Sequence, residues 1–299
     1  MIGWFVTTSI TSSLVYLPPA WRSPWRSGQA IRVSSEPSAI YTAQYIESPL
    51  LLDGRLSDPR WKSAAKSPRF VDMATGDPAP FNTQAAVLWD ETNLYVGFWV
   101  EEPFPTAQLT ERDSLIFKEN DVEVFIDGGD AYYEFEINAR NTVYEVFFIW
   151  RDAYRRGSRF DTAEFDVIER DALTFGGNFD RTEEHFWRGT HPRGARWAFL
   201  DWDFPGLESR VYVDGVLNDK SQISRGWTAE LVFPWAGMKD LANGRSLPPT
   251  DGDIWNLFFG RFQKIPIGES EVQAAWCWTP HGVYDTHMPD KFTPIRFSR

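Results

Sequence analysis

The chain has 299 residues, of which 42% are hydrophobic and 24% are charged, so it can bury a substantial globular core. The net charge of −12, with no basic cluster to offset it, argues against nucleic acid as a partner. The single cysteine, Cys277, rules out an intrachain disulfide framework, and no run is apolar and long enough for a membrane span.

Residues 1–39 differ in composition from the rest of the chain. An apolar segment broken by Thr and Ser, without a positively charged start, precedes a stretch rich in Pro, Ser and Arg. This pattern favours an N-terminal tail or linker without fold content. A weak signal peptide and a disordered segment are the alternatives. Because no convincing signal peptide is present, the compartment stays open between the cytoplasm and secretion.

From residue 40 onward, short segments of alternating hydrophobicity are separated by turn residues, which is typical of an all-β domain. We predict one antiparallel β-sandwich, jelly-roll-like, over residues 40–299. Residues 151–225 are less regular and contain several Gly and Pro turns. They are predicted to be a long insertion that covers or extends a binding face, not a second core.

Strand register predicts a row of carboxylates. A turn at residues 128–131 places Glu123 opposite Glu136, and a turn around residues 140–141 places Glu136 opposite Glu145. Like charges directly opposite one another destabilise a sheet, so a compensating cation or the protonation of one acid is expected. Four interpretations remain open: a nearby arginine (Arg140, Arg151 or Arg261), a calcium ion held by Glu123, Glu136 and Glu145, an acid pair for glycosidic chemistry, or an error in the predicted register.

Five motifs follow one another along the chain: LLDGRLSDPRW (51–61), AAVLWDETNLYVGFWVEE (85–102), NDVEVFID (120–127), YYEFEIN (132–138) and GWTAELVFPW (226–235). Trp61 and Trp89, which lie in two of them, are expected in the core because of their strand or entry positions. In this order the motifs resemble the family 9 carbohydrate-binding modules and related DOMON-like sandwich domains.

The resemblance implies a sugar end held between two aromatic rings, with polar strand residues on its hydroxyl groups, and often a structural calcium. By position, Phe117 is the first ring, and Glu136 and Asn138 are the polar strand residues. Glu136 is an acid where the family pattern has a basic residue. The second ring falls within residues 275–292, although Thr286 or His287 stands at the expected Trp position.

The segment AWCWTPHGVYDTHMPDKF (275–292) concentrates aromatic and polar side chains. A transition-metal site and a hydrolase site are alternatives, but metal-ligand spacing and a nucleophile elbow are both missing from this segment. Core packing is a further alternative. We favour a sugar-binding surface, with no organic cofactor, built from Trp276, Trp278, His281, Tyr284, Asp285 and His287.

These observations predict non-catalytic carbohydrate binding, in polysaccharide or oligosaccharide catabolism, with a separate glycoside hydrolase as a candidate partner. One alternative is a glycoside hydrolase or lyase that uses Glu123, Glu136 and Glu145. The other is a protein-interaction module whose aromatic residues contact a protein.

Overall fold

The computed structural model describes residues 39–176, 191–268 and 270–299, so the predicted N-terminal tail lies almost entirely outside the described residues. The strands are β1 (Tyr41–Tyr45), β2 (Val71–Asp72), β3 (Thr83–Trp89), β4 (Asn93–Glu101), β5 (Asp121–Asp127), β6 (Ala131–Asn138), β7 (Val143–Trp150), β8 (Leu173–Phe175), β9 (Arg196–Phe199), β10 (Glu208–Asp214), β11 (Gly226–Pro234), β12 (Ile254–Ile267), β13 (Ser270–Cys277) and β14 (Thr293–Ser298). The short helical elements are α1 (Pro59–Ser63), η3 (Ile116–Lys118), η4 (Ala163–Phe165), η5 (Trp235–Met238), α2 (Lys239–Ala242) and η6 (Pro289–Lys291).

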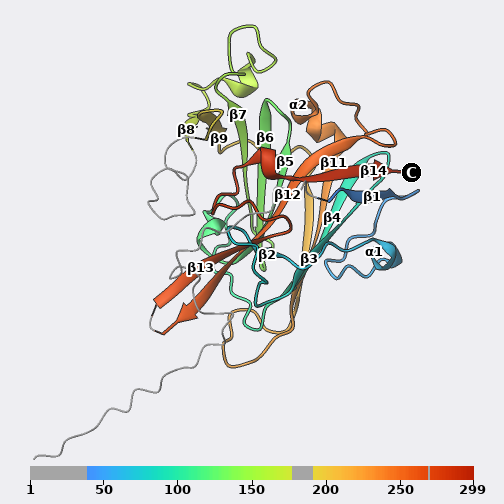
Figure 1. Ribbon diagram of the computed structural model, residues 1–299, viewed down its shortest axis with the longest axis vertical. Coiled ribbons are helices and arrows are strands. Elements are labelled where there is room, and N and C mark those ends of the chain that lie inside the picture. Colours follow the sequence, from blue (N-terminus) through green and yellow to red (C-terminus); the bar gives the residue numbers. More distant parts are fainter. Residues whose placement is uncertain (1–38, 177–190, 269) are drawn as a thin grey trace, which may run out of the picture.

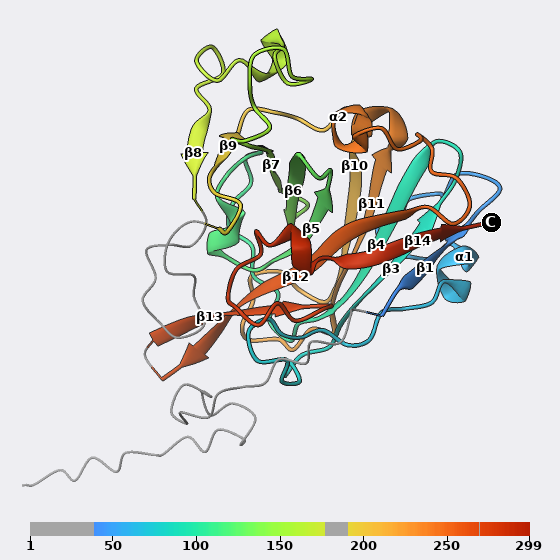
Figure 2. The same ribbon diagram turned by 45° about the horizontal axis from the view of Figure 1, so that its top comes forward.

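Within the described residues, the strands form one large sheet that folds over into two layers (Figures 1 and 2). The strand order is β10-β11-β4-β3-β1-β14-β12-β5-β6-β7-β9-β8, while β13 pairs with β12 and β2 pairs with β13. Rings from the two layers meet in the core, with centroids 5.5 Å apart for Phe135 and Phe233 and 6.3 Å apart for Phe98 and Phe259. The predicted all-β sandwich is therefore confirmed.

The sheet is mixed, which the sequence pattern did not predict. Strand β1 runs parallel to both of its neighbours, β14 and β3, whereas the other described strand pairs are antiparallel. Alternating hydrophobicity shows which face of a strand is buried but not the direction in which the neighbouring strands run. The parallel pairing of β1 therefore could not be predicted from this pattern. Among the described residues, none of the helices combines the length and apolar character needed to cross a bilayer.

The described part of residues 151–225 extends the edges of both layers. Strand β9 pairs with β7 and carries β8, so these two strands continue the β5–β6–β7 layer. Strand β10 pairs with β11 at the opposite end of the strand order. The segment therefore adds edge strands to the sandwich.

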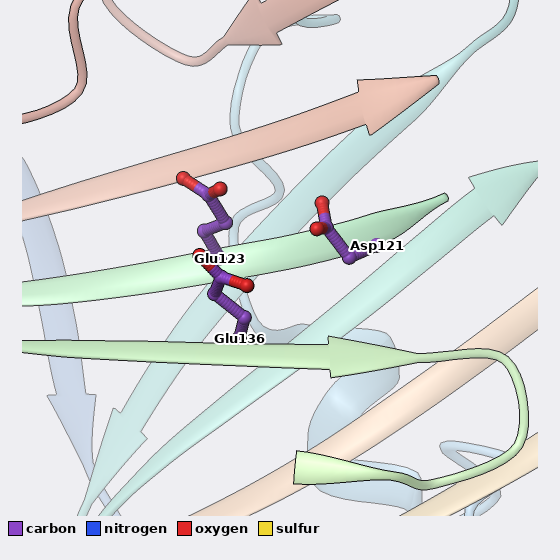
Figure 3. Close-up of side chains that lie close together, drawn as sticks. All are labelled: Asp121, Glu123 and Glu136. Carbon is purple, nitrogen blue, oxygen red and sulfur yellow. The ribbon is translucent and has the colours of Figure 1, made fainter. Parts of the chain in front are cut away.

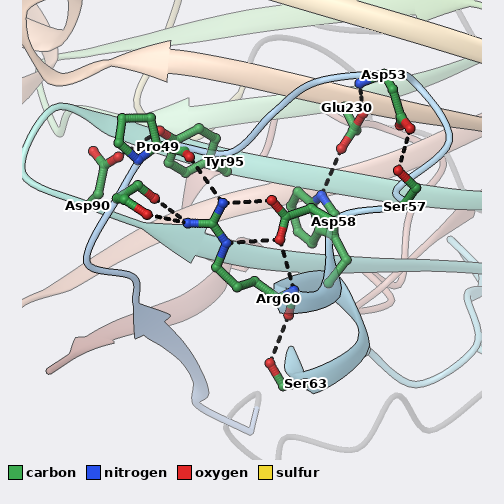
Figure 4. Close-up of polar contacts among 11 residues, drawn as sticks. Pro49, Asp53, Ser57, Asp58, Arg60, Ser63, Asp90, Tyr95 and Glu230 are labelled. Atoms are coloured by element: carbon green, nitrogen blue, oxygen red, sulfur yellow. Dashed lines mark hydrogen bonds and ion pairs between the residues drawn. The ribbon is translucent and has the colours of Figure 1, made fainter.

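A buried carboxylate fastens the first motif to the last (Figure 4). Glu230 of β11 is 1% exposed and accepts hydrogen bonds from the backbone N–H groups of Asp53 and Gly54 at 2.8 and 2.6 Å. Its other oxygen accepts from Trp61 Nε1 at 2.8 Å. Trp61 and Trp89 are 1% and 0% exposed, as predicted for core residues. The motif at residues 51–61 is thus a structural clasp on β11.

Candidate functional site

The predicted register of the β5–β6 hairpin is confirmed. Asp121 is paired with Asn138, Glu123 with Glu136, and Phe125 with Glu134. Because side chains alternate across a strand, these residues share one face of the layer, while Val122, Val124 and their neighbours form the core face. The acidic side chains of β5 and β6 therefore gather on the face turned away from the sandwich core.

The predicted position of Glu145 is wrong. Glu145 is paired with Phe135, and Glu136 with Tyr144, so Glu145 points to the opposite face. The connection between β6 and β7 has one residue more than the predicted turn, with Asn141 in the left-handed region at φ 65°. A short polar residue such as Asn tolerates this conformation, and the added residue reverses the face of every side chain that follows.

Glu145 has its own partners on the core side. Its Oε2 accepts hydrogen bonds from the Tyr133 hydroxyl at 2.6 Å and from the Phe204 N–H at 2.9 Å. Arg112 forms an ion pair with Oε1. Glu145 therefore lies outside the carboxylate row, and this removes it from the predicted calcium ligands and from the predicted catalytic acids.

Asp121 takes the place of Glu145 in the cluster. Asp121, Glu123 and Glu136 each offer a carboxylate oxygen within 4.8 Å of the other two (Figure 3). The three residues are between 1% and 2% exposed, and each has one buried carboxylate oxygen without a hydrogen-bond partner. Burial, followed by repulsion from neighbouring carboxylates, raises the pKa of each group well above its ordinary range.

Glu134 extends the acidic face toward the C-terminal loop. Burial raises the pKa of Glu134 to about 8, although a hydrogen bond with Glu136 counteracts this and Asp285 adds repulsion. His287 Nε2 lies 3.9 Å from Glu134 Oε1, but burial holds the pKa of His287 well below its ordinary value. A neutral imidazole cannot compensate the Glu134 charge.

The arginines predicted to compensate the row lie elsewhere. Arg261 is paired in register with Val122, so it points to the core face, where it hydrogen-bonds Thr83 and Gln263 and lies 3.8 Å from Glu102. Arg140 donates to a backbone carbonyl, and the Arg151 guanidinium packs on Trp197. Only Asp121 receives a favourable influence from Arg261, and burial outweighs it.

The donor type of the cluster suits calcium. Calcium binds 6–8 oxygen ligands, and carboxylates are frequent among them. The unpartnered oxygens of Asp121, Glu123 and Glu136 would supply the first of these ligands. Calcium binding stays a prediction, now centred on Asp121, Glu123 and Glu136.

A cavity of about 300 Å³ opens beside the acidic face. Glu123, Glu134 and Glu136 line one part of it. Aromatic rings line much of the remainder, and two ring pairs are held edge to face, Phe117 with Tyr144 at 5.6 Å and Phe262 with Tyr284 at 5.9 Å. The full lining is Phe117, Glu123, Glu134, Glu136, Tyr144, Val146, Phe148, Leu173, Thr174, Phe175, Ala198, Leu200, Phe262, Gln273, Tyr284, Asp285, Thr286 and His287.

Gln273 joins the two ring pairs. Its side-chain amide donates to the Phe117 carbonyl, and its own carbonyl accepts from the Tyr284 hydroxyl at 2.9 Å. Gln273 is on β13, Phe117 is in η3 and Tyr284 is in the loop before η6. These contacts hold one ring from η3 and one ring from the loop before η6 against β13.

Five of the nine predicted sugar-binding residues line this cavity, and four do not. Those in the lining are Phe117, Glu136, Tyr284, Asp285 and His287. The other four are Asn138, Trp276, Trp278 and His281, and each has a different environment.

Asn138 is a turn residue. Its amide group donates to the Leu109 carbonyl and to Glu119, and its oxygen accepts from the N–H groups of Arg140 and Thr142. This set of partners uses its hydrogen-bonding capacity, which leaves little for a ligand. Asn138 therefore stabilises the β6–β7 connection.

The two tryptophans and His281 are packing residues. Trp276 is 2% exposed and lies beneath the Arg261 guanidinium, and Trp278 is 8% exposed and packs against Tyr41 and Phe259. His281 lies 5.0 Å from the Phe258 ring, and burial lowers its pKa to about 4. The ring density in residues 275–292 indicated a stacking surface, but the side chains at 276 and 278 face the core.

The sequence reasoning missed Glu134, Tyr144, Phe262 and Gln273. Glu134 could have been predicted from the sequence, because this residue lies two positions before Glu136 on the same strand and therefore shares its face. Tyr144 depended on the correct β6–β7 register. Phe262 and Gln273 lie on the long β12–β13 hairpin, whose pairing brings both to the cavity.

A scan against family models matches residues 52–163 to a family described as "Carbohydrate family 9 binding domain-like". The matched segment contains almost all of the first motif and the next three in full, so the resemblance predicted from these motifs is confirmed there. A search of curated proteins found no match.

A search of solved structures found similar chains, and those described below have TM-scores under 0.5. A family 9 carbohydrate-binding module from Caldicellulosiruptor kristjanssonii in complex with cellotriose is 14% identical, with a TM-score of 0.48, covering 87% of this chain and 94% of that one. A module of that family from the same organism with glucose is 13% identical, with a TM-score of 0.45 and coverages of 86% and 96%. A Bacteroides uniformis protein to which carbohydrate binding has been attributed is 13% identical, with a TM-score of 0.49 and coverages of 87% and 100%.

Proposed function

We propose, on the premise of the family 9-like segment at residues 52–163, that this protein binds carbohydrate without cleaving it, in the cavity beside β5, β6 and β7. The observation that carries the proposal is the composition of that cavity, in which aromatic rings surround buried carboxyl groups. Sugars present both apolar C–H faces and hydroxyl groups, so rings and hydrogen-bonding groups in one cavity complement them.

The size of the cavity fits a small ligand. Ligand pockets of proteins have volumes of about 300–1,000 Å³ and combine apolar walls with a few polar groups. At about 300 Å³ this cavity is at the lower end of that range. We therefore propose that it receives one end of a saccharide. A catabolic role and a glycoside hydrolase partner follow from the resemblance alone and remain part of the proposal.

The enzymatic alternative has less support. Glycoside hydrolases use two carboxyl groups that flank the scissile bond, about 5–5.5 Å or 6.5–9.5 Å apart. Glu123 and Glu136 are instead direct cross-strand neighbours on one face of the sheet, so they do not flank a cleft, and Glu145 is on the other face. Hydrolysis of a glycan panel that stops in Glu123→Gln would favour the enzyme.

Calorimetric titration with a panel of oligosaccharides tests the proposal, with cellotriose and glucose as the first members. Calorimetry is preferable to tryptophan fluorescence, because no tryptophan is among the described residues that line the cavity. Each titration is run with calcium and again with a chelator, which also tests the predicted ion. Saturable binding of one sugar class supports the proposal.

Two variants locate the binding. Phe262→Ala removes a ring from the cavity wall, whereas Phe104→Ala removes a ring that is 42% exposed and lines a separate pocket. Loss of sugar binding in the first variant but not in the second supports this cavity. Absence of saturable binding across the panel, with the protein folded, contradicts the proposal and favours the protein-interaction alternative.

A further inference from the structure

The described lining of the cavity is rich in carboxyl groups. Four carboxyl groups line it, from Glu123, Glu134, Glu136 and Asp285, and none of the lining residues that the structure describes is a lysine or an arginine. His287 is the remaining titratable nitrogen of that lining, and burial keeps it neutral. A neutral sugar offers hydroxyl groups to such a site but no positive charge.

Two of these carboxyl groups each have one oxygen without a hydrogen-bond partner. Oε2 of Glu123 and Oε2 of Glu136 are buried and accept no hydrogen bond, although both residues line the cavity. Most buried polar atoms in proteins are hydrogen-bonded, since leaving one unpaired costs about 1–3 kcal/mol. The two oxygens therefore form a ready pair of acceptors for a donor that enters the cavity.

Two cations near the cavity lie outside its lining. The buried Arg196 guanidinium donates through Nη2 to the His287 carbonyl at 2.6 Å and packs 4.3 Å from the Trp150 ring centroid, while its Nε and Nη1 have no hydrogen-bond partner among the described residues. The Lys118 side chain is exposed, with its ammonium 5.8 Å from the centroid of Phe117. Neither residue is in the lining, and among the described residues neither Glu123 nor Glu136 forms an ion pair with a cation.

The walls also suit a cation. The electron-rich faces of aromatic rings attract ammonium groups by roughly 0.5–2 kcal/mol, depending on desolvation. Phe117, Tyr144, Phe262 and Tyr284 supply four rings around the carboxyl groups. Calcium gains nothing from rings and requires 6–8 oxygen ligands, whereas an ammonium group needs three acceptors. The acidic floor and aromatic walls together match an organic ammonium better than a metal ion.

We propose that the cavity selects a saccharide unit that carries a protonated amine, an amino sugar with a free amino group. The ammonium donates to Glu136 and Glu123, while the rings of Phe262 and Phe117 contact the apolar face of the sugar. This inference rests on the proposed carbohydrate binding and names the ligand class of the same site.

The test compares three β-1,4-linked disaccharides by calorimetry at pH 6.5 on the full chain. They are the glucosamine disaccharide, its N-acetylated form and cellobiose, which share their rings and linkage and differ at C2. A hydrogen bond to a charged group contributes about 1.5–3 kcal/mol, so the free amine is expected to bind about tenfold tighter or more than the other two. Glu136→Gln and Glu123→Gln should each reduce this preference.

Glu271→Gln is the matched control. Glu271 is an exposed acid of β13 that lines a separate pocket, and its replacement should leave the preference unchanged. Thermal unfolding of each variant reports whether it is folded, and the comparison of ligands on the unchanged protein decides the question without any variant.

Each outcome bears on a different statement. Equal or tighter binding of cellobiose overturns the amine selectivity and leaves the proposed carbohydrate binding intact. No binding of any saccharide overturns both. Calcium alone is titrated as well, and saturation by calcium that displaces the glucosamine disaccharide assigns the carboxyl groups to a metal and overturns the inference.

Discussion

The buried glutamate on β11 and the two buried glutamates on β5 and β6 differ in how fully they are hydrogen-bonded. Glu230, on β11, accepts from two backbone N–H groups and an indole N–H, so both of its oxygens have partners. Glu123 and Glu136, on β5 and β6, each keep one buried oxygen without a partner. All three side chains are between 1% and 2% exposed, so burial alone does not separate them.

The difference lies in what each carboxyl group does for the fold. Burial raises the pKa of Glu230, and its three hydrogen bonds counteract that effect, so the group serves as a fixed acceptor for the clasp at residues 53–61. For Glu123, burial and repulsion from Asp121 and Glu134 act in the same direction. A carboxyl group that has all its partners stabilises the fold, whereas one that lacks them is available to a ligand.

The largest expected effect is on stability, in Glu230→Ala. Two buried donors, the Gly54 N–H and the Trp61 indole N–H, lose their acceptor, at about 1–3 kcal/mol for each unsatisfied group, so the free energy of unfolding should fall by about 2–6 kcal/mol. Urea denaturation measures the change. Glu208→Ala, an exposed acid on β10, should change it by less than about 0.5 kcal/mol. A small change in the free energy of unfolding for Glu230→Ala would contradict the structural role given to Glu230.

The next effect concerns pH and Glu134→Gln. The pKa of Glu134 is raised to about 8 in the folded protein, so folding favours the protonated form of its side chain. The stability that depends on this proton is fully present below about pH 4.5 and is lost as the pH rises through about 8. The variant lacks this loss, so it should become more stable than the natural protein by about 2–4 kcal/mol at pH 9.

The comparison between the two proteins isolates Glu134. The other titratable groups that face it are Glu136 on its own strand, Glu123 on β5, Tyr144 on β7, and Asp285 and His287 in the C-terminal loop, and both proteins contain them. Urea denaturation at intervals from pH 5 to 9 gives the two profiles. Parallel profiles would show that Glu134 titrates normally.

A smaller effect is expected on ligand affinity, in Phe117→Ala. Phe117 is half-buried and contributes one of the cavity rings, so its loss should reduce sugar affinity by about 1–3 kcal/mol. Trp278→Ala, by contrast, should lower stability, because Trp278 packs in the core and is not part of the lining. Calorimetry for affinity and urea denaturation for stability separate the two outcomes.

The smallest effect is expected for Glu136→Gln at pH 7. Burial and the neighbouring carboxylates raise the pKa of Glu136 well above its ordinary range, so a negative charge at this position is unfavourable, and glutamine has nearly the same shape without that charge. The free energy of unfolding should change by less than about 1 kcal/mol. A loss as large as that of Glu230→Ala would mean that Glu136 has a structural partner.

Local patterns in the sequence predicted the all-β class and the β5–β6 hairpin correctly. Alternation of Val122, Val124 and Ile126 with acidic and aromatic residues specifies which face is buried, and the short turn after Asp127 sets the register. The acidic face of this hairpin therefore follows from local alternation and turn length. Glu145 was misplaced because one extra turn residue, with Asn141 in the left-handed region, reverses the face of β7.

The sequence by itself determined the all-β class, the core tryptophans Trp61 and Trp89 and the concentration of carboxyl groups on β5 and β6, because these depend on residue type and a period of two. Only the tertiary structure decided which of the aromatic residues in 275–292 reach the cavity, and that Phe262 and Gln273 join them. That assignment depends on how β12 and β13 pair and on how the last loop packs against β6 and β9. These are contacts between residues far apart in the chain, which local periodicity does not encode.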